Sequence, residues 1–461
     1  MLFSTGGALA GLAIAIVLIV RKATPAYALV FGALLGGLLG GGELETTVSA
    51  MVAGTRSMMP SVLRILSSGI LVGALLGGLF GGGGLETTVS AMVAGTRSMM
   101  PSILRILSSG ILVGALVKTG SAAKIADAIV AGLGTRFALT AVALATMIVT
   151  AVGVFVDIAV ITVAPVALAV GKKANISVPA LLLAMVGGGK AGNVISPNPN
   201  TIAVAEAFKL DLTTVMAANI VPAICALVMT VVLSSWLAKR WRDCGTTETA
   251  GTTETAGTGE VRLIQAVLGP LVVVGLLSLR PLCGFVVDPL VALPAGGLVS
   301  ILVCGKWRDT VAYSEFGLSK VIGVSILLIG TGTIAGIVKG SGLNGDMIRL
   351  LNACHLPVFA LAPISSILLS GATASTTAGV TIASQTFSGA LLQAGIPSVS
   401  AAAMLHAGGT IFDALPHGSF FHATAGAVGM SVKDRLKLFP FGTLVGATTT
   451  VASTLVYLVT K

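Results

Sequence analysis

Charged residues are scarce in this sequence, and their scarcity excludes an ordinary soluble domain. They make up 10% of the 461 residues, whereas soluble proteins carry about 25%. Hydrophobic residues make up 55%, and the mean hydropathy is +1.02. Because one membrane-spanning helix needs ~20 apolar residues, the chain has room for about ten to twelve such helices. We therefore expect an all-α polytopic membrane protein.

The sequence also lacks the motifs of common enzyme and metal sites. Its five cysteines are scattered without CxxC spacing, which predicts neither a disulfide framework nor a metal site. It has no His-Glu-x-x-His pattern, and Gly187-Gly-Gly-Lys190 is followed by alanine rather than the Ser or Thr of a phosphate-binding loop. We therefore expect no enzymatic activity and no cofactor. Because no ATPase domain is attached, we expect an ion gradient to drive any uphill transport.

The net charge of +10 does not indicate a nucleic-acid partner, because the basic residues lie in short clusters between apolar runs. That arrangement is typical of cytoplasmic loops. Two such clusters are Lys172–Lys173 and Lys239–Arg242. The segment Met1–Gly7 has no basic region of the kind that opens a cleavable signal. We expect a multi-pass protein of the inner (plasma) membrane, with the lipid bilayer as its surroundings.

A polar linker divides the chain into two halves. Residues 241–260 contain Gly-Thr-Thr-Glu-Thr-Ala twice in succession, and such a low-complexity run cannot bury a core. Basic residues flank it on both sides, which predicts a cytoplasmic location. We therefore expect a first repeat over residues 1–240 and a second over residues 261–461.

The first half contains a near-identical tandem duplication. Residues 32–75 recur as residues 73–116, an offset of 73 − 32 = 41, and only three of the 44 paired positions differ. Repeats that build folds are usually degenerate, so this identity indicates a recent duplication or an assembly error. We expect the extra copy to add no net membrane crossing, because one added span would invert every basic loop that follows.

The most unusual stretch is Gly187-Gly-Gly-Lys190-Ala-Gly-Asn193-Val-Ile-Ser196-Pro-Asn198-Pro-Asn200-Thr201. Its prolines forbid a continuous helix, and its amide and hydroxyl side chains stand between apolar flanks. Broken backbone at membrane depth is tolerated only where it is buried in protein or lines a cavity. We interpret residues 179–208 as a first re-entrant hairpin with this stretch at its tip.

A matching stretch lies in the second half. Residues 370–379 are small, polar and uncharged, and residues 358–387 around them form the second expected hairpin. Paired interruptions in the two halves of a chain are a pointer to the binding site of a transporter. The alternative is that both are sites of tight helix packing, which explains Gly and Ala but not Ser-Pro-Asn-Pro-Asn-Thr.

The two interruptions predict an anion site. Natural N-caps occur near Asn200–Thr201 and near Thr376–Thr377. The N-terminus of a half-helix carries partial positive charge and free N–H groups, which favour a carboxylate. Neighbouring hydroxyl and amide groups suit a hydroxylated substrate. Lys190 either adds positive charge to this site or extends toward the membrane interface.

Several titratable residues are candidates for coupling. Asp157 lies inside an apolar run, where it either titrates or accepts hydrogen bonds from backbone donors. His406, Asp413, His417 and His422 fall within 422 − 406 + 1 = 17 residues, and histidine titrates near physiological pH. We interpret this cluster as a proton relay, with substrate contact, packing and metal binding as alternatives. No histidine pair has the i, i+4 spacing of a helical zinc site.

Three segments resemble the gluconate permease family, within the ion transporter superfamily. They are Gly189-Lys-Ala-Gly-Asn-Val-Ile-Ser-Pro-Asn-Pro-Asn-Thr201, residues 371–379, and His417-Gly-Ser-Phe-Phe with Gly-Met-Ser-Val-Lys-Asp-Arg-Leu-Lys437 shortly after. The resemblance covers the chain apart from the extra 41 residues. It implies proton symport of gluconate or a related small carboxylate. It also implies inverted-topology repeats, paired re-entrant hairpins, a homodimer and elevator-type movement.

The resemblance implies that the two tips consist of Ser196, Asn198, Asn200, Thr201, Thr373, Ser375, Thr376 and Thr377. We expect these residues, together with Asn193, to bind the substrate. The function expected is import of a small hydroxylated carboxylate with protons. One alternative is a sodium-coupled carrier or antiporter on the same fold, because amide and carbonyl oxygens also coordinate Na⁺. The other is a receptor or scaffold in the membrane that does not transport.

Overall fold

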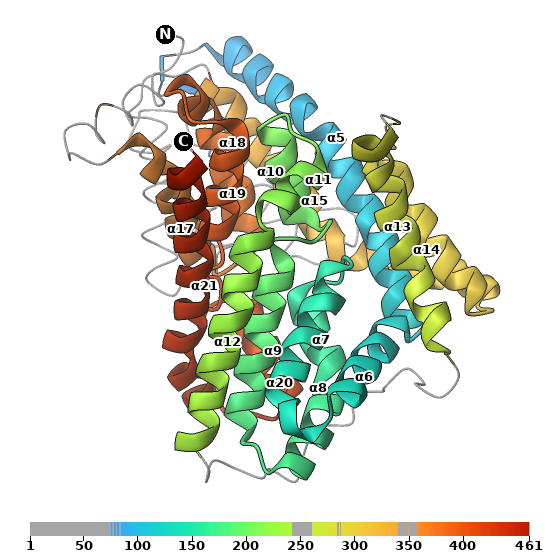
Figure 1. Ribbon diagram of the computed structural model, residues 1–461. Coiled ribbons are helices and arrows are strands. Elements are labelled where there is room, and N and C mark those ends of the chain that lie inside the picture. Colours follow the sequence, from blue (N-terminus) through green and yellow to red (C-terminus); the bar gives the residue numbers. More distant parts are fainter. Residues whose placement is uncertain are drawn as a thin grey trace, which may run out of the picture.

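Helices are the only regular elements in the part of the chain that the structure describes (Figure 1). The computed structural model describes residues 84–241, 261–283, 287–339 and 357–460, with isolated positions at 75, 78, 79, 81, 82, 285 and 349. The expected all-α class is confirmed. Nearly all of the first repeat copy (residues 32–75) and all of the linker after Trp241 lie outside the described residues.

One group of helices is built on α5 (Leu85–Lys118) and α15 (Thr310–Lys339), which pack along each other. Their contact is backbone to backbone, because a Cβ at Gly114 would overlap the carbonyl oxygen of Tyr313 and one at Gly110 would lie 2.9 Å from that of Gly317. The remaining members are α13 (Leu263–Cys283), α14 (Pro289–Val303) and the short 3-10 turn η2 (Trp307–Asp309).

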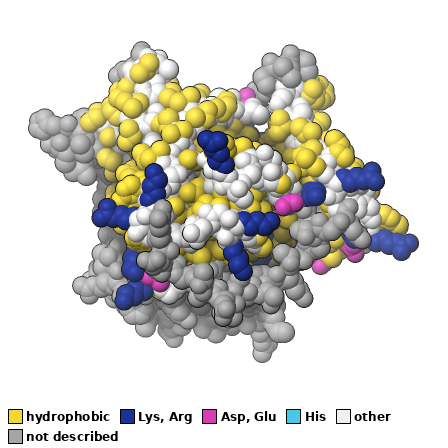
Figure 2. All heavy atoms as spheres, turned by 60° about the horizontal axis from the view of Figure 1, so that its bottom comes forward, with side chains coloured by type: hydrophobic (Ala, Val, Ile, Leu, Met, Phe, Trp, Pro, Cys, Tyr) yellow, Lys and Arg dark blue, Asp and Glu magenta, His cyan; other side chains and the backbone are white. Residues whose placement is uncertain are grey.

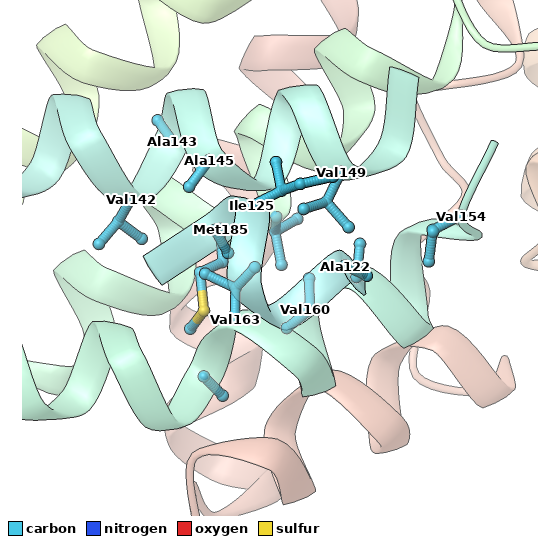
Figure 3. Packing of buried hydrophobic residues seen from close by; sticks show 14 of the residues in the cluster. Ala122, Ile125, Val142, Ala143, Ala145, Val149, Val154, Val160, Val163 and Met185 are labelled. Carbon is cyan, nitrogen blue, oxygen red and sulfur yellow. The ribbon is translucent and has the colours of Figure 1, made fainter. Parts of the chain in front are cut away.

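The first half continues as a bundle of shorter helices. They are α6 (Ser121–Leu133), η1 (Thr135–Phe137), α7 (Ala138–Ala151), α8 (Val156–Ala174), α9 (Val178–Asn193), α10 (Pro199–Ala207), α11 (Leu212–Ala218) and α12 (Ile220–Arg240). Figure 3 shows their core, where Ile125, Val142, Val163 and Met185 meet from α6, α7, α8 and α9. Small residues such as Ala143 and Ala145 let these helices approach closely.

The second half repeats the order of elements. After α15 come η3 (Val358–Ala360), α17 (Leu361–Thr373), α18 (Thr376–Gln393), α19 (Ser398–Gly408), α20 (Ser419–Ala427) and α21 (Val432–Thr460). In each half, a pair of helices with a short connection precedes two helices separated by a non-helical segment, and a long helix ends the half. The long helices α12 and α21 pack against each other and against α9 (Figure 1).

Three described helical segments are long and apolar enough to cross a membrane, namely Met100–Lys118, Ile220–Arg240 and Val432–Thr460. The segments Ser121–Leu133 and Thr135–Ala151 pass the same test together but are bent by 105°. Large apolar side chains are exposed along α12, including Ile224, Val228 and Val232, as a surface in contact with lipid tails requires. Figure 2 shows one end of the molecule, where basic side chains outnumber acidic ones.

Arg105 on α5 joins the two groups of helices. Its guanidinium binds the carboxylate of Asp288, which precedes α14, with Nη2 2.7 Å from Oδ2, and it also contacts Glu206 on α10. A cavity of 190 Å³ opens beside this cluster, between α10, α11, α13 and α14. Since the Arg105 guanidinium is already engaged by the carboxylates of Glu206 and Asp288, we look for the functional site elsewhere.

Candidate functional site

The first interruption is shorter than the sequence predicts. Residues 187–193 belong to α9, and only residues 194–198 are non-helical before α10 begins at Pro199. The glycines remain helical because their faces are packed: a Cβ at Gly188 would overlap the backbone of Ala143 on α7. In the described structure α10 does not pack along α9, whereas α18 packs along α17. Of the two expected hairpins, the second therefore has packed arms, and the first is a helix interrupted at mid-length.

A closed hydrogen-bond network organises this first tip. The Asn198 side chain caps α10, its Oδ1 accepting from the N–H groups of Asn200 (2.9 Å) and Thr201 (3.1 Å). Its Nδ2 donates to Oδ1 of Asn193 at 2.6 Å, and Nδ2 of Asn200 donates to the same oxygen at 3.1 Å. The structure thus brings four predicted site residues together. Two buried oxygens nearby, Ser196 Oγ and Asn200 Oδ1, have no hydrogen-bond partner among the described residues.

The second tip consists of two residues, Ala374 and Ser375, between α17 and α18. Ala374 is left-handed, with φ of 47°, a strained conformation for a residue with a Cβ. Ser375 caps α18 by accepting from the N–H of Ala378 at 3.3 Å. Thr373 bonds back to the carbonyl of Leu369 at 2.8 Å, and the Thr377 side chain is partly exposed.

Two further interruptions lie beside the two tips. Residues 152–155 separate α7 from α8, and a Cβ on Gly153, where φ is +117°, would lie 3.9 Å from Pro197 of the first tip. Residues 409–418 separate α19 from α20, and a Cβ on Gly418 would lie 2.6 Å from the Cβ of Ala374 at the second tip. In each half, the connection between two neighbouring helices therefore lies beside the break in another helix.

A buried ion pair links the two halves at these interruptions. Lys190 Nζ, near the end of α9, lies 2.6 Å from Asp413 Oδ1, and the two side chains are 1% and 6% exposed. The other oxygen of Asp413 accepts from the Thr376 hydroxyl at 2.8 Å. Lys190 also donates to the carbonyls of Thr410 (2.6 Å) and Gly442 (3.1 Å). Lys190 therefore points inward, and the alternative prediction, that it extends toward the membrane interface, is wrong.

The remaining titratable candidates do not join this cluster directly. His417 Nε2 lies 3.2 Å from the carbonyl oxygen of Ala372, beside the second tip. His422 is exposed and contacts the carbonyl of Pro416 at 2.8 Å. His406 is fully buried, and neither ring nitrogen has a partner among the described residues. Asp157 accepts from the N–H of Ile158 at 2.9 Å, in the first turn of α8.

The supply of backbone donors differs between the two tips. In α10 the Asn198 side chain occupies the first two N–H groups, and Ile202 N–H bonds to the Asn198 carbonyl, so the helix end is already satisfied. In α18 the N–H groups of Thr376 and Thr377 have no acceptor among the described residues. The backbone donors without an acceptor therefore lie at the second tip, where the Thr376 hydroxyl also donates to Asp413.

Sequence reasoning anticipated one part of this arrangement only roughly and missed another. Residues 137–170 are apolar for longer than one span, which predicts two spans or a broken one, but this length does not locate the connection at residues 152–155. Arg435 is 1% exposed in the first turn of α21, although its neighbours Lys433 and Lys437 are exposed. A cluster of four charged residues at positions 433, 434, 435 and 437 gives no indication of which one faces inward.

Comparisons with known proteins agree with this architecture. The model of the family described as "GntP family permease" matches residues 69–460. A protein of Haemophilus influenzae called "Uncharacterized transporter" is 46% identical over 456 residues, covering 99% of this chain and 98% of that protein. The crystal structure of the YdaH transporter of Alcanivorax borkumensis is similar with a TM-score of 0.56 at 16% identity, over 81% of this chain and 89% of that one. At that identity the likeness concerns the fold alone.

Proposed function

The chain belongs to the GntP family of permeases, and on that premise we propose that it imports a small hydroxylated carboxylate, such as gluconate or a related sugar acid, by proton symport. Membership in a permease family favours transport over a receptor or scaffold. The basic clusters Lys172–Lys173 and Lys239–Arg242 favour the inner membrane, with these ends in the cytoplasm.

The observation that carries the proposal is the buried connection from Lys190 through Asp413 to Thr376. It joins the end of α9 to the start of α18, so one carboxylate holds an interruption from each half. The free N–H groups of Thr376 and Thr377 are hydrogen-bond donors for an oxygen atom of the substrate. The hydroxyl and amide groups of the two tips would then bind the hydroxyls of the substrate.

Asp413 is the group that we propose exchanges the proton. As an anion it is held by Lys190 and by the Thr376 hydroxyl. Protonation removes the counter-ion of Lys190 and weakens the contact with Thr376, which frees both groups for an anionic substrate. Proton and substrate would then enter together, as symport requires. His417, beside the second tip, would pass protons between Asp413 and the outside of the site.

We further propose that the two halves are inverted-topology repeats and that the protein is a homodimer with elevator-type movement. The matching order of elements in the halves supports the first point. The helices α5, α13, α14 and α15 pack mainly on one another, which supports a fixed part against which the rest moves.

Purified protein in proteoliposomes tests the function. Radiolabelled gluconate should accumulate when the lumen is alkaline relative to the bath, and a protonophore should abolish the accumulation. A panel of sugar acids, hydroxy acids and amino acids, each competing with the label, would define the substrate. Absence of counterflow for every carboxylate in the panel would refute the proposal.

Sodium coupling is the second candidate, and a specific observation favours it. Ser196 Oγ and Asn200 Oδ1 are buried oxygens without partners at the first tip, and Na⁺ prefers such neutral oxygen ligands. Replacing Na⁺ with choline separates the two mechanisms. Uptake that continues in choline but stops with a protonophore indicates proton coupling. Uptake that stops in choline but continues with a protonophore indicates sodium coupling.

A further inference from the structure

Arg435 is a buried cation that no described anion neutralises. It lies in the first turn of α21, and its side chain is 1% exposed. Its guanidinium lies over the ring of Phe421 on α20, 5.4 Å from the centroid. No carboxylate of the described residues lies within ion-pair distance, and its Nε and Nη2 atoms have no hydrogen-bond partner there.

Burying such a charge costs free energy of folding, so its position in the structure needs an explanation. An uncompensated buried charge destabilises a protein, and buried guanidinium groups are normally paired. The charged neighbours on α21 do not help, because Asp434 pairs with Lys437 at the surface, at 2.8 Å. The contact with the Phe421 ring leaves the Nε and Nη2 donors without partners among the described residues.

The position of Arg435 relates it to the site at the interruptions. Gly442, whose carbonyl binds Lys190, lies seven residues further along α21. Seven residues span about 10 Å of helix, or about two turns, so Arg435 and Gly442 lie on the same buried face of α21. Asp413 interacts electrostatically with Arg435 and forms an ion pair with Lys190. The group thus contains two cations and one anion and lacks one negative charge.

We propose that Arg435 binds the carboxylate of the transported substrate. A carboxylate accepts two parallel hydrogen bonds from a guanidinium, which would use donors that the protein leaves without partners. It would also supply the missing negative charge. Arg435 thereby selects acids over uncharged analogues of the same shape, and the inference rests on the proposed transport of a carboxylate.

Binding of an acid and its amide to purified protein tests this role. The probes are D-gluconate and D-gluconamide, which share their hydroxyls and differ in charge. In the wild type the acid should bind more tightly than the amide. Arg435→Gln should lower the affinity for the acid by about 10- to 100-fold, because charge-assisted hydrogen bonds are lost. It should change the affinity for the amide little. Arg435→Lys, which keeps the charge and loses the bidentate geometry, should fall between.

Lys433→Gln is the matched control, because it removes an exposed cation two residues away. It should leave both affinities unchanged. If Arg435→Gln lowers the affinities for both ligands equally, or lowers neither, Arg435 has a structural role and the inference is overturned. If the wild type binds no carboxylate of the panel, the proposed function itself fails and takes this inference with it.

A measurement on the wild type covers the case in which the variants do not fold. Phenylglyoxal modifies arginine, and mass spectrometry reports the modification of Arg435 separately from that of exposed Arg308. D-gluconate should slow the modification of Arg435 and leave Arg308 unaffected, whereas D-gluconamide should protect neither. Equal protection of Arg435 by both ligands would overturn the inference, and so would the absence of any modification of Arg435 without ligand, since a substrate could then not reach it either.

Discussion

Lys190 and Asp413 form a buried ion pair across the two halves of the chain, 2.6 Å between Nζ and Oδ1. The partners come from the end of α9 and from the break between α19 and α20. Because both are buried, neither charge is stable in place without the other. The contact therefore couples the packing of the halves to the charge state of one carboxylate.

Removal of one partner of this pair should destabilise the protein. Lys190→Met leaves Asp413 without its counter-ion, and we expect a loss of about 3–5 kcal/mol, typical of a broken buried pair. The double variant Lys190→Met/Asp413→Leu should recover most of the stability but not transport. Thermal unfolding followed by size-exclusion chromatography measures this, with exposed Lys173→Met as control. Wild-type stability of Lys190→Met would contradict the prediction.

Proton coupling should be separable from exchange. Asp413→Asn and His417→Gln should lose pH-driven accumulation but keep counterflow, because exchange needs no net proton movement. Proteoliposomes with and without a pH gradient measure both activities. Asp127→Asn, an exposed acid on α6, is the control and should retain both. If both activities disappear together, the two residues act in binding or folding instead.

At the first tip we expect substitutions of two kinds. Asn198→Ala and Asn200→Ala should abolish uptake while expression and oligomeric state persist, since the lost cap costs only about 1 kcal/mol. Ser196→Ala removes a buried hydroxyl that has no described partner, so it should leave the unfolding temperature unchanged. A drop in affinity for substrate or ion in Ser196→Ala would identify a direct contact. Wild-type uptake in all three variants would remove this tip from the site.

Acid should weaken the junction between α5 and α14. The hydrogen bond from Arg105 holds the pKa of Asp288 below its usual value. The resulting stabilisation is complete above the unfolded pKa of about 4 and is lost as the pH falls through the lower folded pKa. Because the Asp288 side chain is 43% exposed, we expect less than about 1 kcal/mol.

The corresponding experiment compares Asp288→Asn with the wild type across pH. The variant should have a lower Tm at pH 7, and the difference should shrink below about pH 4. Asp127→Asn should follow the wild-type curve throughout. A difference that grows toward acid pH would show that Arg105 does not stabilise the charged form.

Deletion of one 41-residue unit should preserve or improve expression and transport. The first copy and Cys244 lie outside the described residues, so labelling has to report on them. The labelling uses three proteins: Ser57→Cys and Ser98→Cys, each in a cysteine-free background, and a protein that retains only Cys244. We expect Cys244 to be labelled from the cytoplasmic side. Loss of folding on deletion, together with an external Cys244, would establish the extra copy as a full span.

The sequence singled out polar residues that lie together in the structure, but it did not predict how the backbone around them folds. Asn193, Asn198, Thr376 and Asp413 were identified because polar groups are rare in this composition, and rarity at membrane depth indicates function. Helix pairing was harder to predict. The glycines before Lys190 suggested an unwound tip, but they are helical, since whether glycine bends or packs depends on the neighbouring helix.

The direction of individual side chains was the second feature that could not be predicted from the sequence. Lys190 had two opposite interpretations from sequence, and only the backbone carbonyls of Thr410 and Gly442, both remote in the chain, decide between them. Arg435 had no signal at all, because its inward direction follows from the rotation of α21 about its axis. The apolar connection at residues 152–155 shows that a break needs no polar residues if its neighbours cover it.

The backbone contact of Gly110 and Gly114 with α15 has a consequence for how the chain assembles. The tandem copy carries the same glycines at positions 69 and 73, and the same arginine at position 64 as at 105. The chain thus encodes one half of a helix interface twice and its complement, around Gly317, once. During folding, two copies of the sequence that fits α15 would therefore compete for one partner.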